Sequence, residues 1–267
     1  MKQPITPKLI ILAAGEGSRL KPYTLDKPKC LVPLHGKSIL SWQVSLAHQF
    51  NIYDIIVVKG YKHEKIQENH IRSYINTAYD HTNMVETLWC AQEEFKEDII
   101  ISYGDILYNA DVLSALIQSP HDISVVIDKD WLQYWKQRFI NPLEDAESLH
   151  IDSSGKILEI GQKVSDYTKI QGQFIGLMRF KNNGIKALKN FYMLAKEETG
   201  CGKKIFRTPR PFHKIFMTDF LQGMIDFGYP ILEVPIKRNW LEIDSPSDYD
   251  LAKQITISET SQLKFLS

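Results

Sequence analysis

An apolar run near the start of the chain, Leu9 to Ala13, ends directly at the small-residue loop Ala14-Gly15-Glu16-Gly17. A continuous apolar run of this length is typical of a strand that is buried on both faces of a sheet. Strands of this kind occur in parallel sheets whose two faces are covered by helices. The run therefore favours an α/β fold built around a parallel sheet.

The rest of the first half repeats this rhythm of strand and helix. A helix is predicted from near Ser38, a strand at 54–59, a helix at 84–95, and strands at 98–102 and 123–127. Short β-branched runs that alternate with helical segments predict a Rossmann-like mixed, mostly parallel sheet.

After Asp128 the pattern changes to short strands joined by turns. Antiparallel strands are predicted at 146–152, 155–161 and 173–181, helices at about 183–198 and 214–227, and strands at 231–234 and 237–243. We expect one domain over 1–253, with halves at 8–128 and 129–253, a small α+β insertion in the second half, and a C-terminal tail at 254–267.

The charge balance excludes a strong field over the whole molecule. Lys and Arg total 32, as do Asp and Glu, so nothing in the net charge would draw the chain to nucleic acid or an anionic membrane. Cys30, Cys90 and Cys201 lack the spacing of a zinc site or a disulfide framework, which favours a reducing cytosol. The first apolar run is too short for a signal peptide, and no stretch is long enough to span a bilayer. We expect a cytoplasmic protein with no nucleic-acid partner and no membrane insertion.

The loop after the first predicted strand is suited to binding phosphate. Glycines and other small residues let backbone N–H groups approach a polyphosphate closely. By itself Gly15-Glu16-Gly17 fits a plain tight turn equally well, because the third glycine of a dinucleotide fingerprint and the ending of a P-loop are both missing. However, Arg19 follows two residues after Gly17, and the segment Pro28 to Pro33 reads PKCLVP.

The combined pattern over 12–33, LAAGEGSRLKPYT and then PKCLVP, resembles the signature of the sugar-phosphate nucleotidyltransferases. That family includes cytidylyltransferases acting on choline phosphate and aminoethylphosphonate, and the resemblance covers about residues 8–253. It implies the nucleotide-diphospho-sugar transferase fold, with a nucleotide-binding half before an acceptor-binding half. It also implies that the glycine loop wraps a triphosphate while Arg19 and Lys29 contact its phosphates. The nucleotide-binding residues implied are Leu12, Ala13, Ala14, Gly15, Glu16, Gly17, Ser18, Arg19, Lys29, Thr82, Asn83 and Gly104.

Two carboxylates, Asp105 and Asp244, follow predicted strands. An Asp at the carboxyl end of a parallel strand points into the crevice where open α/β sheets bind ligands. Mg²⁺ is held by one or two carboxylates together with substrate phosphates. Both residues match family positions that hold the catalytic metal, so the resemblance implies Mg²⁺ as cofactor and Arg19, Lys29, Asp105 and Asp244 as the catalytic group. A capping role for Asp244 is the alternative, because Ser245-Pro246 follows; Glu242 is a weaker candidate near the metal.

The segment Thr82 to Leu88, TNMVETL, indicates the nucleotide base. It resembles the cytidylyltransferase branch more than the thymidylyl or guanylyl branches, which makes CTP the predicted donor. Asn83 as a simple helix cap is the alternative interpretation.

The stretch Asp128 to Arg138 places two Trp and a Tyr among acidic residues. Aromatic faces and carboxylates suit an ammonium group, and the alternative is a hydrophobic patch that packs the insertion. The segments 159–163 and 170–177 resemble the branch that makes CDP-activated zwitterions, which implies phosphocholine, 2-aminoethylphosphonate or a similar acceptor. Arg138 or Lys163 is predicted to grip its phosphoryl group. The predicted acceptor-binding residues are Trp131, Trp135, Arg138, Asp145, Glu147, Lys163, Phe174 and Asp219.

Two features depart from the family pattern. Phe174 stands where related sequences often have Tyr, and the basic segment Cys201 to His213 has no counterpart. That segment is predicted to be a loop, either a solvated surface loop or one that captures phosphate or contacts another subunit.

The reaction implied is direct displacement of pyrophosphate from CTP by the acceptor. A phosphate monoester has its second pKa near 6, so the acceptor oxygen needs no general base. Two alternatives are an enzyme of the same fold that makes an NDP-sugar, and a catalytically silent nucleotide-sensing module. The chain retains both cations and both carboxylates of the predicted catalytic group, which disfavours the silent module. Whether the chain forms a homodimer is left open.

Overall fold

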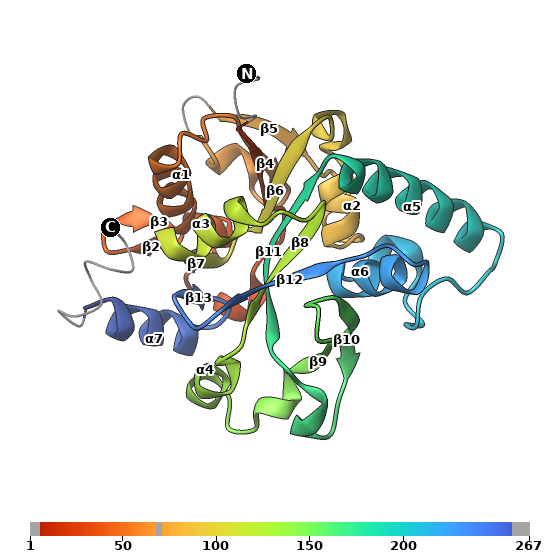
Figure 1. Ribbon diagram of the computed structural model, residues 1–267. Coiled ribbons are helices and arrows are strands. Elements are labelled where there is room, and N and C mark those ends of the chain that lie inside the picture. The colour runs from red at the N-terminus through yellow and green to blue at the C-terminus, as the bar shows by residue number, and fades with distance from the viewer. Residues whose placement is uncertain (1–5, 68–70, 258–267) are drawn as a thin grey trace, which may run out of the picture.

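A computed structural model describes residues 6–67 and 71–257, and its centre is a seven-stranded sheet (Figure 1). The strands lie in the order β12-β8-β11-β6-β1-β4-β5. Their bounds in chain order are β1 Lys8–Ala13, β4 Ile55–Lys59, β5 Arg72–Ile75, β6 Asp98–Tyr103, β8 Ile123–Asp128, β11 Gln173–Lys181 and β12 Leu232–Ile236. The first predicted strand, Leu9 to Ala13, thus lies inside the sheet, between β6 and β4.

The sheet is mixed and mostly parallel, as predicted. β1 runs parallel to β4 and β6, β4 to β5, and β8 to β12. β11 runs antiparallel to both of its neighbours, β6 and β8. Because β11 and β12 come from the second half of the chain, a boundary at residue 128 does not divide the sheet.

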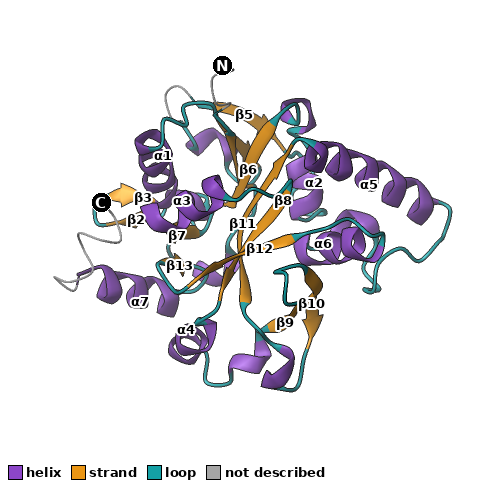
Figure 2. Ribbon diagram, viewed as in Figure 1, coloured by secondary structure: helices purple, strands orange, loops and turns teal. Residues whose placement is uncertain are grey.

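Helices cover both faces of the sheet (Figure 2). One face packs against α1 Ile39–Gln49, α3 Ala110–Gln118, α4 Trp131–Arg138 and α7 Pro246–Ile257, and the other against α2 Met84–Trp89, α5 Asn183–Gly200 and α6 Met217–Asp226. Alternate side chains of β1 enter the two cores: Leu9 and Ile11 join the first, and Ile10 and Leu12 join the second. This is why the run has no polar side.

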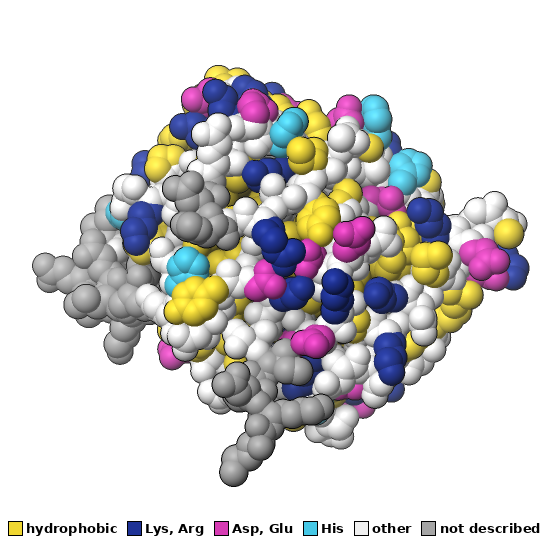
Figure 3. Space-filling view, turned by 90° about the horizontal axis from the view of Figure 1, so that it is seen from above, with side chains coloured by type: hydrophobic (Ala, Val, Ile, Leu, Met, Phe, Trp, Pro, Cys, Tyr) yellow, Lys and Arg dark blue, Asp and Glu magenta, His cyan; other side chains and the backbone are white. Residues whose placement is uncertain are grey.

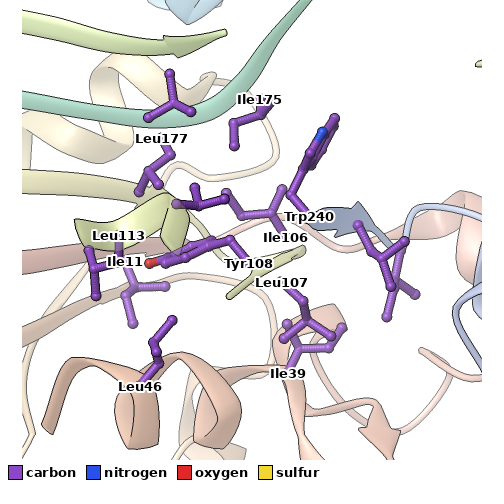
Figure 4. Packing of buried hydrophobic residues seen from close by; sticks show 14 of the residues in the cluster. Ile11, Ile39, Leu46, Ile106, Leu107, Tyr108, Leu113, Ile175, Leu177 and Trp240 are labelled. Atoms are coloured by element: carbon purple, nitrogen blue, oxygen red, sulfur yellow. The ribbon is translucent and has the colours of Figure 1, made fainter. Parts of the chain in front are cut away.

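The core beside α1 and α3 combines side chains from segments far apart in the sequence. Ile11, Leu46, Leu113 and Leu177 come from β1, α1, α3 and β11 and gather in one cluster (Figure 4). Removing one such leucine side chain costs about 2–5 kcal/mol in well-packed cores. This packing keeps the loops at the ends of β1 and β6 on a rigid support.

The insertion in the second half is a hairpin with short helical turns. β9 Glu147–Ile151 and β10 Ile157–Lys163 pair antiparallel as predicted, in a two-stranded sheet separate from the central one. Short 3-10 helices occupy Pro142–Glu144 and Tyr167–Lys169. The hairpin packs on α6, where Gly161 approaches Thr218 so closely that a Cβ at 161 would lie 2.4 Å from the Thr218 Cβ.

Two predicted elements are shorter than expected. The helix predicted over 84–95 ends at Trp89 and is followed by a 3-10 helix, Gln92–Glu94. The strand predicted at 237–243 is β13, Trp240–Glu242, which pairs antiparallel with β7 Ile106–Tyr108. Asp244 therefore does not follow a strand of the parallel sheet, and that part of the reasoning for its position was wrong. A further short pair, β2 Pro33–Leu34 and β3 Lys37–Ser38, precedes α1.

The surface carries both signs of charge. On the face shown in Figure 3, Lys and Arg side chains are interspersed with Asp and Glu. Among the described residues, no helix is long and apolar enough to cross a membrane.

Candidate active site

The loop after β1 has a backbone that only glycine adopts easily. Gly17 lies in the left-handed region with φ 67° and ψ 42°, and a Cβ there would approach the Lys29 Cβ to 3.0 Å. The Thr24 hydroxyl donates to the Gly17 carbonyl at 2.9 Å, which holds the turn. A 3-10 helix, Ser18–Leu20, begins next and carries Arg19. The glycine therefore lets the loop turn tightly against the segment that carries Lys29.

Asp105 is positioned by the end of β6. The Gly104 N–H donates to the Leu12 carbonyl at 2.9 Å, and a Cβ at 104 would lie 2.8 Å from that oxygen. The next residue, Asp105, accepts at its carbonyl from the Ile243 N–H at 3.0 Å. This bond joins the segment after β6 to the segment after β13, so Asp105 and Asp244 lie near each other despite the antiparallel setting of β13.

The four residues predicted as the catalytic group lie together. Lys29 Nζ is 2.6 Å from Asp105 Oδ2 and 2.6 Å from Asp244 Oδ1. Arg19 Nη2 forms an ion pair with Asp244 Oδ2. The Arg19 side chain is 72% exposed whereas that of Lys29 is 15% exposed, so solvent reaches Arg19 far more than Lys29.

Mutual charge shifts the protonation equilibria of this group. Burial by itself lowers the pKa of Lys29, but Asp105 and Asp244 outweigh it and raise the pKa above its ordinary value. Burial by itself raises the pKa of Asp244, but Lys29 and Arg19 outweigh it and hold the pKa below its ordinary value. Lys29 is therefore a cation and Asp244 an anion at neutral pH.

The two carboxylates fit a magnesium site. Asp105 Oδ1 is buried and has no hydrogen-bond partner in the described part of the chain, so it is an oxygen available to a ligand. No group of three or more His, Cys, Asp or Glu side chains that could hold a metal occurs within 6–67 and 71–257. Two carboxylates that share Mg²⁺ with substrate phosphates and water match the usual coordination of this ion.

A hollow of about 340 Å³ lies over the glycine loop and the two carboxylates. All thirteen of the predicted catalytic and nucleotide-binding residues other than Glu16 line it. These are Leu12, Ala13, Ala14, Gly15, Gly17, Ser18, Arg19, Lys29, Thr82, Asn83, Gly104, Asp105 and Asp244. The Glu16 side chain instead pairs with Lys21 at 3.0 Å.

Asn83 caps a helix, as one interpretation of the sequence predicted, while its predicted role in binding the nucleotide stays a prediction. Its side chain caps α2 by accepting from the Met84 N–H at 2.8 Å, and the residue also lines the hollow. Sequence reasoning missed Tyr79, Thr87 and Tyr103, which line the same hollow. Tyr103 directly precedes Gly104-Asp105, so its place in that motif was the available signal.

Trp131 and Trp135 do not offer open aromatic faces. They are 5% and 4% exposed and belong to the hydrophobic core, which corrects the expectation that they receive the acceptor's cationic end. Their rings pack edge to face at 5.8 Å, and Trp135 also packs against Trp240. The hydrophobic patch, the alternative interpretation, describes this helix better.

Arg138 is also engaged within the protein. Its side chain is 2% exposed and pairs with Asp248 Oδ1 at 2.8 Å and Glu242 Oε2 at 2.6 Å. This corrects the expectation that Arg138 binds the acceptor's phosphoryl group. To do so, Arg138 would have to break its ion pairs with Asp248 and Glu242. Arg138 links α4 to α7 and to β13.

Three of the other predicted acceptor-binding residues are acidic: Asp145, Glu147 and Asp219. We call them the carboxylate cluster. Asp145 accepts from Trp135 Nε1 at 3.0 Å. Burial raises the pKa of Glu147 to about 7, a hydrogen bond from Thr218 opposes the rise, and Asp219 and Asp145 add to it. Asp219 accepts from the Phe216 N–H at 2.8 Å and so caps α6.

Phe174 and Lys163 lie at the edges of this region. The Phe174 ring is 6.0 Å from that of Tyr103, which lines the hollow, whereas Lys163 is exposed at the end of β10. Burial is the main cause that raises the pKa of Tyr103, and the negative charges of Glu147 and Asp105 raise it further. The Glu147 N–H donates to the side chain of Gln173, which precedes Phe174, so the carboxylate cluster lies near the side of the hollow that Tyr103 forms.

The basic loop 201–213 lies against α2 and α6. The Asn83 N–H donates to the His213 carbonyl at 3.0 Å, and Arg210 pairs with Asp219 at 3.1 Å. The loop lines a second, more open hollow of about 720 Å³. The loop therefore contacts one predicted nucleotide-binding residue, Asn83, and one predicted acceptor-binding residue, Asp219.

Comparisons with known proteins agree with this geometry. Residues 9–157 match the model of the MobA-like NTP transferase domain. The chain is 38% identical over 254 residues to a CTP:phosphoglutamine cytidylyltransferase of Campylobacter jejuni, covering 91% of this chain and 97% of that protein. It is 33% identical over 105 residues to a choline-phosphate cytidylyltransferase of Streptococcus pneumoniae, covering 38% of this chain and 46% of that protein.

Solved structures share the fold. A CTP:phosphocholine cytidylyltransferase from Streptococcus pneumoniae superposes with a TM-score of 0.68 at 20% identity, covering 94% of this chain and 99% of that one. The inositol-1-phosphate CTP transferase from T. maritima gives a TM-score of 0.68 at 19% identity, covering 96% and 98%.

Proposed function

This chain belongs to the MobA-like NTP transferase family, and we propose that it transfers CMP from CTP to a phosphorylated zwitterionic small molecule and releases pyrophosphate. The observation that carries the proposal is the meeting of Arg19, Lys29, Asp105 and Asp244 beside a glycine loop. Two cations and two carboxylates in one hollow are what a metal-bound triphosphate requires.

CTP as donor is supported by the names of the relatives. The Campylobacter jejuni protein, similar over nearly its whole length, and the Streptococcus pneumoniae protein are both named as cytidylyltransferases. Thr82, Asn83 and Thr87 bring polar groups to the hollow at the start of α2. We assign the base to this end of the hollow and the phosphates to the glycine loop.

In the proposed reaction the acceptor oxygen attacks the α-phosphorus of CTP opposite the pyrophosphate. Arg19 and Lys29 neutralise the phosphate charge that opposes the approach, and the loop amides hold the triphosphate in line. Mg²⁺ held by Asp105 and Asp244 would supply further charge neutralisation at the phosphates. The carboxylate cluster receives the ammonium end of the acceptor.

The test is a pyrophosphate-release assay with Mg²⁺. CTP, UTP, GTP and dTTP are each combined with phosphoglutamine, choline phosphate, 2-aminoethylphosphonate and hexose 1-phosphates. We expect turnover with CTP and an ammonium-bearing acceptor. Preference for another nucleotide, or for a hexose 1-phosphate, would contradict the proposal and favour an enzyme that makes an NDP-sugar.

Two further measurements, the stereochemistry at the α-phosphorus and gel filtration of the protein after reaction with CTP alone, separate the two chemical routes. Direct displacement predicts inversion at a chirally labelled α-phosphorus and no nucleotide left on the protein after gel filtration. Retention of configuration, or isolation of a nucleotidylated chain, would contradict direct displacement.

A further inference from the structure

Three arginines, Arg138, Arg179 and Arg207, each hold a carboxylate by the edge of the guanidinium group that Nε and Nη2 form. Arg138 donates from this edge to Asp248 at 2.8 and 3.3 Å, Arg179 to Asp98 at 2.9 and 2.6 Å, and Arg207 to Asp226 at 2.9 and 2.5 Å. Two parallel N–H donors on a planar group match the two oxygens of a carboxylate. The edge is therefore the carboxylate-binding side of these residues.

Arg210 is held differently. Its Nη1 donates to Asp219 Oδ2 at 3.1 Å and to Thr208 Oγ1 at 3.0 Å, and its guanidinium carbon lies 3.8 Å from the centre of the Phe216 ring. Its Nε and Nη2 donate to no acceptor within the described residues. The side chain is 38% exposed. The plane is thus fixed by one nitrogen and one ring, while the carboxylate-binding edge is open.

The surroundings of Arg210 carry the opposite charge. Its partner Asp219 is 6% exposed. The negative charges of Asp219 and Asp145 raise the pKa of Glu147, and the positive charge of Arg210 lowers it. An open cationic edge held by Asp219, within electrostatic reach of Glu147, offers complementary partners for a ligand that carries a carboxylate and an ammonium group close together. A ligand with an ammonium group alone would leave the edge unpaired.

We propose that the Nε and Nη2 edge of Arg210 binds a carboxylate of the acceptor, so that the acceptor is a phosphorylated α-amino acid. This inference rests on the proposed function and adds the substrate class to it. Glu147 and Asp145 receive the α-ammonium group, and Asp219 holds Arg210 in orientation. Choline phosphate and aminoalkylphosphonates lack the carboxylate and are expected to be poor acceptors.

The experiment compares phosphoglutamine with its decarboxylated counterpart, phosphorylated at the same position, in the pyrophosphate-release assay. We expect the wild type to prefer phosphoglutamine by about 10- to 100-fold in kcat/KM, the range for leaving one charged group without its partner. Arg210→Gln is expected to remove most of this preference by raising the KM for phosphoglutamine. The KM for CTP and the turnover of the decarboxylated acceptor should change by less than about threefold.

Two further variants keep the test informative. Arg210→Lys retains a cation beside Asp219 but lacks the planar edge, so it is expected to fold normally and still lose the preference. Arg207→Gln is the matched control in the same loop, because the edge of Arg207 is already used by Asp226. It is expected to keep the wild-type preference.

The outcomes are distinguishable. If the wild type turns over phosphorylated acceptors but does not distinguish the two, or if Arg210→Lys keeps the wild-type preference, the inference about Arg210 is overturned. If no acceptor gives pyrophosphate release with any nucleotide, the proposed function itself fails.

Discussion

The ammonium nitrogen of Lys29 lies 2.6 Å from Oδ2 of Asp105, and it also bridges to Asp244 at 2.6 Å. One buried cation thus compensates two carboxylates that come from distant parts of the sequence. The same three groups are proposed to act on the triphosphate, so their substitution is expected to change both stability and activity.

Replacing Lys29 with Met is expected to lower kcat/KM by about 100- to 1,000-fold, the usual loss when one charge-stabilising donor is removed from a reaction centre. It should also lower the free energy of unfolding by about 3–5 kcal/mol, because two nearby carboxylates lose their counter-ion. Urea unfolding with and without Mg²⁺ measures the second effect. Part of the loss should return with Mg²⁺; equal losses in both conditions would count against a metal held by these carboxylates.

Replacing Asp105 or Asp244 with Asn is expected to lower kcat by at least about 100-fold and to weaken Mn²⁺ binding in the presence of CTP. Each change replaces a negatively charged carboxylate, the ligand type that Mg²⁺ and Mn²⁺ prefer, with a neutral amide. Mn²⁺ binding followed by electron paramagnetic resonance gives a measurement independent of turnover. Asp226→Asn is the matched control, since Asp226 pairs with Arg207 outside the hollow. Normal Mn²⁺ binding by both site variants would exclude the proposed metal ligands.

Glu147 gives a prediction about pH. Burial raises its pKa in the folded state to about 7, above its usual value of about 4.5. The folded state therefore favours the protonated form, and this contribution to stability is complete below the unfolded pKa and is lost as pH rises through about 7. Glu147→Gln stays neutral, so it should gain stability relative to the wild type between pH 5 and about 8. Urea unfolding at several pH values tests this; a difference independent of pH would refute it.

Trp135 is expected to matter for stability rather than for acceptor binding. Trp135→Phe removes the donor to Asp145 and part of a buried ring, which should cost about 1–3 kcal/mol of unfolding free energy. The KM for the acceptor should stay within about twofold of the wild type. Thermal unfolding and acceptor titration measure the two quantities. A large rise in KM with unchanged stability would restore Trp135 as an acceptor contact.

The sequence was sufficient to predict most of the groups that meet at the hollow, but not Tyr79, Thr87 or Tyr103. The strand Leu9 to Ala13, the glycine loop and the residues Arg19 and Lys29 lie within one short stretch, so local pattern constrains them strongly. Asp105 was predicted from its strand end, whereas Asp244 was predicted correctly in position but from a strand that is not in the parallel sheet. The roles of these residues in catalysis stay predictions.

The acceptor side was harder to predict because long-range packing decides it. Trp135 packs against Trp240, and Arg138 pairs with Asp248, about a hundred residues further along the chain. Local sequence shows an aromatic and charged helix but not which side of it the rest of the protein covers. In the same way, the open edge of Arg210 depends on Asp219 and Phe216 and has no signature in the sequence of its loop.

The position of β11 has a consequence for how the chain is made. β11 lies between β6 and β8, both of which precede it in the sequence by more than forty residues. While the chain emerges from the ribosome, β6 and β8 therefore wait with unpaired backbone edges until residues 173–181 arrive. A fragment that ends before residue 173 would expose these edges of β6 and β8. We expect such a fragment to self-associate through them rather than to fold as an independent nucleotide-binding unit.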